Sequence, residues 1–298
     1  MKKLYGVVPA MTTPFDKADH VDIACMRQQV DFLISKGVHG LYPMGTTGEM
    51  LHLTTEERKT VAKTVVEQAD GRVPVYLNCG ANTTREVIEL AQHAAAVGAD
   101  GIGCVTPYYL KVNDREMVEF YTAVANSVPK DFPVYLYGIP QCACNDISLD
   151  ACKTILQRCP NVVGMKYSFM DFNRLIDYCN LDPAFEVMVG LDLVFLQTLT
   201  VGSVGIVSGI SSTYPEPFVA VYNAYVKGDL KEAERLQKIA VRYVRVLRAC
   251  SNMAYFKAAQ EYRGLPGSHM RAPQLDLSDK ERADFLEELK AIDIYGSV

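Results

Sequence analysis

One lysine in this sequence stands where a reactive amine is expected. The run Val162-Val163-Gly164-Met165-Lys166 is apolar and rich in β-branched residues, so it predicts a buried strand that ends on the lysine. An ammonium at the mouth of an apolar site is poorly solvated, which favours the neutral amine. A neutral lysine amine is a nucleophile that forms a Schiff base with a carbonyl substrate. The alternative is a lysine whose ammonium simply reaches water at the strand end.

A glycine-rich stretch could bind the carboxylate of such a substrate. Gly45-Thr46-Thr47-Gly48-Glu49 combines two glycines, which allow tight turns, with two hydroxyls beside backbone N–H groups. Such a loop can hold a carboxylate through several donors at once. A plain turn is the simpler interpretation. A nucleotide phosphate loop is excluded because no Gly-Lys-Ser or Gly-Lys-Thr follows.

Tyrosines end two neighbouring strand-like runs. The motifs are Thr106-Pro107-Tyr108-Tyr109 and Tyr137-Gly138-Ile139-Pro140. A lone tyrosine at a strand end is usually a packing residue, but a phenol bonded to another hydroxyl can relay protons. Schiff-base formation needs such a relay because a carbinolamine must lose its hydroxyl as water. We therefore expect a nucleophile, a proton relay and a carboxylate site on adjacent strand ends.

The elements that must position these groups alternate short apolar runs with amphipathic helical stretches. Parallel neighbours need helical crossovers, so eight strand–helix units predict an α/β fold closed into a (β/α)₈ TIM barrel. In such a barrel the active site lies at the carboxyl ends of the strands. An open doubly wound sheet is disfavoured because no glycine fingerprint follows the first run. The eight runs lie near residues 6–8, 40–42, 73–78, 101–106, 134–137, 162–166, 185–189 and 205–208.

Mostly helical segments follow the last run. We expect residues 1–223 to form the catalytic barrel and residues 224–298 to form a C-terminal helical extension packed on it. Helix starts carry capping signals at Thr54, Thr83 and Ser278, each followed three residues later by a glutamate.

Composition excludes several classes of protein. The net charge of -5 and the lack of a basic cluster argue against a nucleic-acid partner. No apolar run approaches a membrane span, and the N-terminal residues lack the apolar core of a signal peptide. Nine scattered cysteines indicate reduced thiols and a cytoplasmic protein. Neither the histidines nor the Cys142 and Cys144 pair shows zinc-site spacing, so a metal enzyme is the weaker prediction.

Four of these motifs together resemble a known group of enzymes. In this order and spacing they are similar to those of the class I, Schiff-base pyruvate aldolases of the dihydrodipicolinate synthase and N-acetylneuraminate lyase superfamily. The resemblance covers nearly the whole chain. It implies a barrel with C-terminal helices, a homotetramer built as a dimer of dimers, and no metal or organic cofactor. The motifs are Gly45-Thr46-Thr47-Gly48-Glu49, Thr106-Pro107-Tyr108-Tyr109, Tyr137-Gly138-Ile139-Pro140 and Gly164-Met165-Lys166.

The resemblance also implies catalytic roles. Lys166 would form the imine with the ketone carbon of pyruvate, and Tyr137 would shuttle protons. Thr46 would link Tyr137 into a hydroxyl chain that Tyr109 completes from a neighbouring subunit. Thr46 and Thr47 would bind the carboxylate of pyruvate.

On the acceptor side the chain departs from the synthases of the superfamily. Those enzymes carry an arginine where this sequence has Cys142, and a thiol cannot replace a bidentate guanidinium. They also usually carry a glutamate where this sequence has Tyr167. Aspartate semialdehyde is therefore a doubtful acceptor. Val207 occupies the position at which the superfamily places a main-chain carbonyl near the bound pyruvate.

The lyases of the superfamily bind sugar hydroxyls with a Gly-Tyr-Asp-Glu segment, which here is Gly190-Leu191-Asp192-Leu193. Gly190 and Asp192 are kept, although Asp192 could equally cap the following helix. Ser168 stands where the lyases place a hydroxyl residue. Phe169-Met170 replaces a small Ser-Gly pair, which suggests a narrower or more apolar acceptor pocket.

These residues favour a pyruvate-dependent lyase closer to the lyase side of the superfamily. It would cleave a 4-hydroxy-2-oxo acid, such as N-acetylneuraminate or a related keto-deoxy acid, to pyruvate and an aldehyde. Alternatives are a dihydrodipicolinate synthase, a sugar-acid dehydratase and an inactive binding or regulatory relative. The last is disfavoured because Lys166, Tyr137, Thr46 and Tyr109 are all present.

Overall fold

Parallel strands surround the centre of the molecule and carry the candidate residues at one end. The computed structural model describes residues 3–296 and orders its strands β1-β7-β6-β5-β4-β3-β2, all parallel. They are β1 (Gly6–Pro9), β2 (Tyr76–Asn78), β3 (Gly101–Val105), β4 (Val134–Gly138), β5 (Val162–Tyr167), β6 (Glu186–Val189) and β7 (Gly205–Ser208).

An eighth extended segment closes this sheet. Leu41 and Tyr42 lie between β1 and β2 and pair with each side through isolated bridges. The Tyr42 N–H donates to Pro9 O at 3.0 Å, and the Leu41 N–H donates to Pro74 O at 2.9 Å. The predicted (β/α)₈ barrel is thereby confirmed. The segment at residues 40–42 takes the place of the eighth barrel strand, although it pairs only through isolated bridges.

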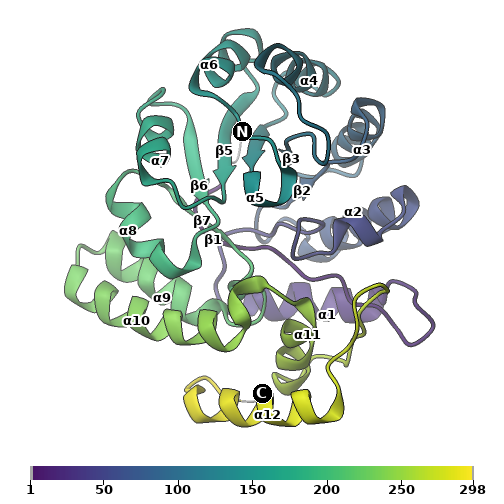
Figure 1. Ribbon diagram of the computed structural model, residues 1–298, viewed down its shortest axis with the longest axis vertical. Coiled ribbons are helices and arrows are strands. Elements are labelled where there is room, and N and C mark those ends of the chain that lie inside the picture. The colour runs from purple at the N-terminus through teal and green to yellow at the C-terminus, as the bar shows by residue number, and fades with distance from the viewer. Residues whose placement is uncertain (1–2, 297–298) are drawn as a thin grey trace.

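Helices ring the strands (Figure 1). Reciprocal capping boxes start α2, α4 and α12, as the Thr54 and Ser278 signals predict. The ring consists of α1 (Ile23–Ser35), α2 (Thr55–Ala69), α3 (Thr84–Ala96), α4 (Asp114–Asn126), α6 (Leu149–Arg158), α7 (Phe172–Cys179), α8 (Phe195–Thr200) and α9 (Pro215–Val226), with the short α5 (Pro140–Ala143) after β4. No helix within residues 3–296 is long and apolar enough to span a membrane.

The barrel interior is filled by tyrosines that lie opposite glycines. A Cβ on Gly103 would overlap the Tyr42 hydroxyl, and one on Gly101 would overlap the Tyr76 ring. The Tyr76 and Tyr135 rings meet edge to face at 5.3 Å. Because the glycines have no side chain, three large rings fit inside a barrel whose other interior side chains are aliphatic or methionine.

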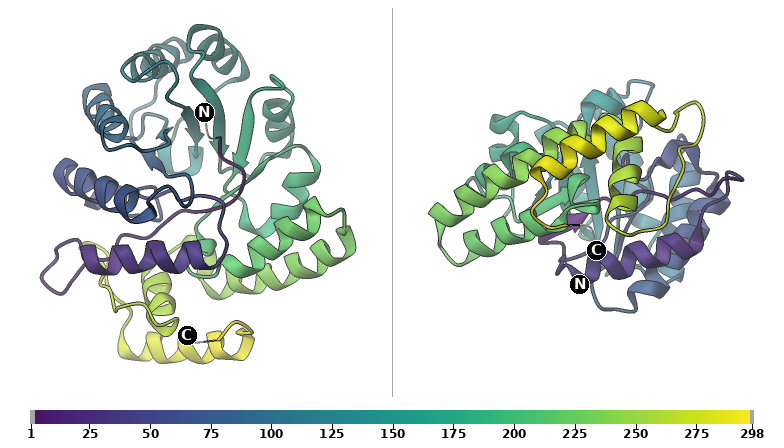
Figure 2. Two further views of the ribbon diagram at one scale, coloured as in Figure 1. Left: turned by 180° about the vertical axis from the view of Figure 1, so that it is seen from behind. Right: turned by 90° about the horizontal axis from the view of Figure 1, so that it is seen from below.

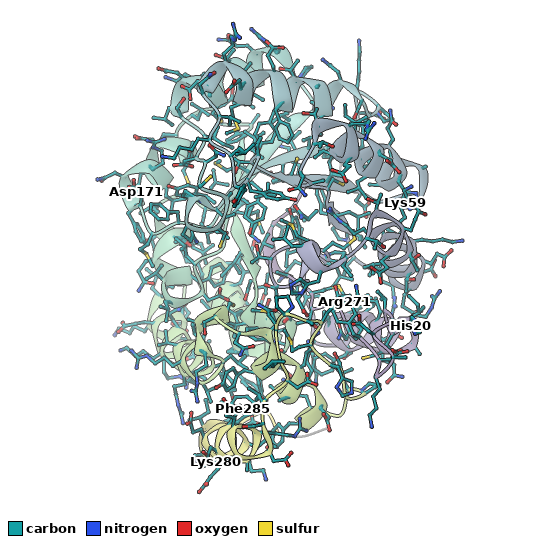
Figure 3. All side chains as sticks on the ribbon, turned by 45° about the vertical axis from the view of Figure 1, so that its right-hand side comes forward. His20, Lys59, Asp171, Arg271, Lys280 and Phe285 are labelled. Carbon is teal, nitrogen blue, oxygen red and sulfur yellow. The ribbon has the colours of Figure 1, made fainter. Side chains whose placement is uncertain are left out.

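The C-terminal helices pack on one side of the barrel (Figure 2). They are α10 (Leu230–Val246), which lies along α9, α11 (Met253–Tyr262) and α12 (Asp279–Ile292). Arg271, labelled in Figure 3, ties the α11–α12 connection to the barrel through Glu57 at 2.8 Å and Asp19 at 2.9 Å. Phe285 of α12 meets Tyr255 of α11 at 5.1 Å. The division expected after residue 223 falls in the last turn of α9 and stays a prediction.

Candidate active site

The lysine that the sequence singles out is buried at the carboxyl end of β5. Lys166 lies beside Tyr137 in the β4–β5 pairing, and its side chain is enclosed, with the residue 5% exposed. The Lys166 Nζ lies 4.3 Å from the centroid of the Tyr137 ring and 5.1 Å from that of Tyr42. The amine therefore does not reach out to water, as the alternative interpretation supposed, but faces two aromatic rings inside the barrel mouth.

A hydroxyl pair lies next to this amine. The Tyr137 hydroxyl is 3.5 Å from Thr46 Oγ1, and either oxygen can donate. The Thr46 loop is held by Thr13, whose hydroxyl donates to Gly48 O at 2.7 Å. Gly48 has no room for a side chain, because a Cβ there would lie 2.8 Å from the Met44 nitrogen. The structure thus brings Thr46, Tyr137 and Lys166 together from three different strand ends.

Thr47 and Val207 approach the same space from the loop and from β7. Thr47 is buried, and its hydroxyl lies 3.1 Å from the position that a Cβ on Gly209 would take. Gly209 directly follows β7, on which Val207 is buried and paired with Val8 of β1. The two residues therefore flank the mouth on the side opposite β4 in the strand order.

Asp192 faces the strand ends instead of capping a helix. The Ser208 hydroxyl donates to its carboxylate, whereas α8 begins after Val194 without a side-chain cap. Burial raises the pKa of Asp192 to about 6, and the bond from Ser208 and the attraction of Lys166 oppose this rise. The helix-capping alternative for Asp192 is therefore wrong.

Ser168 and Gly190 lie against each other beside Lys166. A Cβ on Gly190 would overlap the Ser168 hydroxyl and would lie 3.5 Å from the Lys166 Cε. The Ser168 hydroxyl is buried and has no hydrogen-bond partner within the described residues. An unpartnered buried hydroxyl is costly unless a ligand satisfies it.

Tyr109 stands apart from this cluster. It is 89% exposed and has a left-handed backbone, with φ 71°. Within this single chain it does not join Tyr137 and Thr46, so any part that it plays in a hydroxyl chain requires another copy of the protein.

Sequence reasoning missed four residues around the site. Tyr42 could have been found from its position, because it ends the run at residues 40–42. Side chains of a strand alternate between its two faces, so Tyr42 was a candidate to point into the barrel. Ser208 sits at the end of β7 and could have been found by the same rule that selected the other strand ends. Cys250 and Lys257 lie beyond the barrel strands, and no local pattern assigns them to the mouth.

Two cavities open beside the cluster. The larger, about 260 Å³, includes Thr46, Tyr108, Ile139, Cys142 and Cys250 in its wall. The smaller, about 130 Å³, is lined by Met170, Gly190, Leu191, Asp192, Leu193, Ile210, Val244, Ala249 and Cys250. Among the described residues, neither wall includes a lysine or an arginine. In the same part of the chain, no three His, Cys, Asp or Glu side chains gather as a metal site.

A (β/α)₈ barrel with a buried lysine beside a phenol at its strand ends defines an enzyme of the lysine Schiff-base class. The chain belongs to the dihydrodipicolinate synthetase family, whose sequence model matches residues 3–292. The names of its relatives, which include lyases, aldolases and synthases, make it a lyase of the class I aldolase type.

Three relatives illustrate this membership. The probable 2-dehydro-3-deoxy-D-pentonate aldolase YjhH of Escherichia coli K12 is 36% identical, over 80% of each chain. The 4-hydroxy-tetrahydrodipicolinate synthase of Methanosphaerula palustris is 34% identical, over 97% of this chain and 99% of the relative. The pyruvate complex of YagE from E. coli K12 has a TM-score of 0.92 at 29% identity, covering 98% of this chain and 99% of YagE.

Proposed function

We propose that this protein reversibly cleaves a 2-oxo-3-deoxy sugar acid, or a similar 4-hydroxy-2-oxo acid, to pyruvate and a neutral aldehyde. The observation that carries this proposal is the absence of any lysine or arginine, among the described residues, from the two cavities beside Lys166. A carboxylate or phosphate on the aldehyde would need such a cation. Hydroxyl groups on the aldehyde instead match the Asp192 carboxyl and the unpartnered Ser168 hydroxyl.

In the proposed mechanism Lys166 is the nucleophile. Its neutral amine adds to the ketone carbon, and the carbinolamine loses water to leave a protonated imine. The bond between carbons 3 and 4 then breaks, its electron pair moves toward the imine to form an enamine, and the carbon-4 hydroxyl loses its proton as the aldehyde leaves. Protonation of the enamine carbon and hydrolysis by water release pyruvate and restore the amine.

The proton transfers are assigned to Tyr137. The Tyr137 ring lies nearer to the Lys166 amine than the Tyr42 ring does, at 4.3 Å against 5.1 Å, and the Tyr137 hydroxyl is 3.5 Å from that of Thr46. Thr46 and Thr47 bind the carboxylate of pyruvate through hydroxyl and backbone donors, and the Val207 carbonyl lies beside it. Tyr109 is exposed in the single chain, so association into the expected homotetramer would let it complete the relay of a neighbouring copy.

The alternative functions fit these residues less well. A synthase that uses aspartate semialdehyde needs a cation for the second carboxylate, and Cys142 offers a thiol in the wall of the larger cavity. N-acetylneuraminate would have to place a long, heavily hydroxylated tail against Leu191, Leu193 and Met170. The YjhH relative, named as a pentonate aldolase, supports a shorter acid. A cytoplasmic location accords with cysteines that are all free thiols.

Borohydride trapping with pyruvate tests the proposed function directly. Reduction of the imine should leave a stable adduct on Lys166, located by peptide mass spectrometry, because only an imine is reduced to a secondary amine that survives digestion. Peptides containing Lys257 and Lys153 serve as internal controls and should stay unmodified. Absence of an adduct from the Lys166 peptide of folded protein would refute the Schiff-base mechanism with pyruvate.

The phenol of Tyr137 should account for a large part of the rate. Tyr137→Phe keeps the ring that faces Lys166 and removes only the hydroxyl, so kcat should fall by a factor on the order of 10² to 10⁴. Tyr225→Phe, which deletes a phenol bonded to Leu199 O on the outer helices, is the matched control. Steady-state kinetics of pyruvate release compare the two. A rate for Tyr137→Phe close to that of the control would remove this residue from the relay.

A further inference from the structure

The connection between α10 and α11 forms a short strap over the end of β7. It consists of Arg248–Cys250, and all three residues have left-handed backbones, with φ 56°, 49° and 63°. None of them is glycine, the residue that adopts this conformation at least cost. The strap is anchored by Arg248, whose guanidinium bonds Glu288 at 2.8 Å and lies 5.0 Å from the Tyr255 ring centroid.

Cys250, the last residue of the strap, lies between the two cavities. Cys250 is the one residue, among those described, that lines both the 260 Å³ and the 130 Å³ cavity. Its Sγ lies 2.6 Å from the position of a Cβ on Gly209, where the Thr47 hydroxyl also approaches. Burial raises the pKa of the Cys250 thiol, and the nearby Asp192 charge acts in the same direction. The neutral thiol is therefore a packing group at this position.

The lining of the smaller cavity suits a small ligand with hydroxyl groups. Its wall is apolar except for Asp192, and the buried Ser168 hydroxyl, which has no partner within residues 3–296, presses against its Gly190. An engineered apolar cavity of about 150 Å³ holds one benzene molecule. By that scale this compartment accepts a tail of roughly four to five non-hydrogen atoms.

We propose that Cys250 is a specificity-determining residue that limits the length of the aldehyde. Its side chain closes the smaller compartment against the larger one, so a short neutral aldehyde with hydroxyls toward Asp192 and Ser168 fits, and a longer one meets the thiol. This inference rests on the proposed function, because it assigns the compartment to the aldehyde partner of pyruvate.

Cys250→Gly removes the wall and suits the left-handed backbone, which glycine adopts freely. Aldol addition to pyruvate is measured with glycolaldehyde, glyceraldehyde and arabinose as neutral aldehydes of two, three and five carbons. The ratio of kcat/KM for arabinose to that for glyceraldehyde should rise by about tenfold or more, the discrimination that one or two carbons in a pocket provide.

Asp70→Gly is the matched control, because it relieves a left-handed backbone of φ 46° at the end of α2 and lies in neither cavity wall. It should keep the wild-type ratio. Cys250→Ala, which keeps a Cβ, should give an intermediate ratio and preserves the test if the glycine variant fails to fold.

Borohydride trapping of pyruvate on Lys166 is measured in every variant and does not involve the aldehyde. Intact trapping with an unchanged ratio in Cys250→Gly and Cys250→Ala would overturn the inference while leaving the proposed function standing. Failure of the wild-type protein to trap pyruvate would overturn the proposed function and the inference with it. A raised ratio with intact trapping supports both.

Discussion

Replacing Lys166 with alanine should abolish turnover of every 2-oxo acid while leaving the fold intact. Without the amine no imine forms, so the electrons of the breaking carbon–carbon bond have no acceptor. We expect kcat to fall by a factor on the order of 10⁶, as when the nucleophile of a covalent catalyst is removed. Pyruvate release under saturating substrate, followed by a coupled assay, measures this loss.

The matched control is Lys153→Ala. Lys153 lies on α6 with its side chain 57% exposed and 3.7 Å from Asp150, so its loss should change neither kcat nor stability measurably. Circular dichroism of both variants shows whether the fold is kept. Turnover by Lys166→Ala above a thousandth of the wild-type rate would mean that the buried amine is not the nucleophile, whatever the outcome of trapping.

The sequence could predict the site residues that lie at the carboxyl ends of strands. Lys166 and Tyr137 each end an apolar run, and neighbouring parallel strands place their carboxyl ends at the same edge of a barrel. Their pairing in the β4–β5 register is therefore a consequence of topology. The position of Thr46 follows from the same rule, because its loop directly follows the carboxyl end of the extended segment at residues 40–42.

The contacts that sequence could not predict join segments far apart in the chain. The hydrogen bond from Ser208 turns the Asp192 carboxylate toward the strand ends. In the sequence alone, an aspartate before a helix equally predicts a helix N-cap. Cys250 reaches the barrel mouth because Arg248–Cys250, which join α10 to α11, have left-handed backbones. Arginine, alanine and cysteine do not favour that conformation, so their presence in the sequence does not predict it. Periodicity gives the buried face of a helix, but it does not name the loop against which that face packs.

The same limit applies to a buried ion pair that joins the C-terminal helices to the glycine-rich loop. Lys257 on α11 lies 2.6 Å from Glu49, with side-chain exposures of 2% and 1%. Its ammonium also donates to His269 O at 2.5 Å and lies 4.5 Å from the Phe15 ring centroid. Burial lowers the pKa of Lys257, and the Glu49 carboxylate opposes this shift. Glu49 has a left-handed backbone and closes the loop that carries Thr46.

Lys257→Met should therefore be strongly destabilising and should also weaken pyruvate binding. It leaves the Glu49 carboxylate buried without its cation, and removing one partner of a buried pair costs about 3–5 kcal/mol. For a chain of this size the melting temperature should fall by roughly 10 °C. Because Glu49 and Thr46 share one loop, the KM for the 2-oxo acid should rise more than kcat falls. Thermal denaturation and steady-state kinetics measure the two effects.

An exposed pair of the same length separates burial from charge pairing. Lys238 and Glu234 on α10 are also 2.6 Å apart, but their side chains are 73% and 62% exposed. Lys238→Met should cost less than about 1 kcal/mol, because water solvates the remaining carboxylate. The double variant Lys257→Met with Glu49→Leu should recover part of the stability, since no unpaired charge stays buried. If Lys257→Met proved no more harmful than Lys238→Met, the pair would not anchor the loop that carries Thr46 to the C-terminal helices.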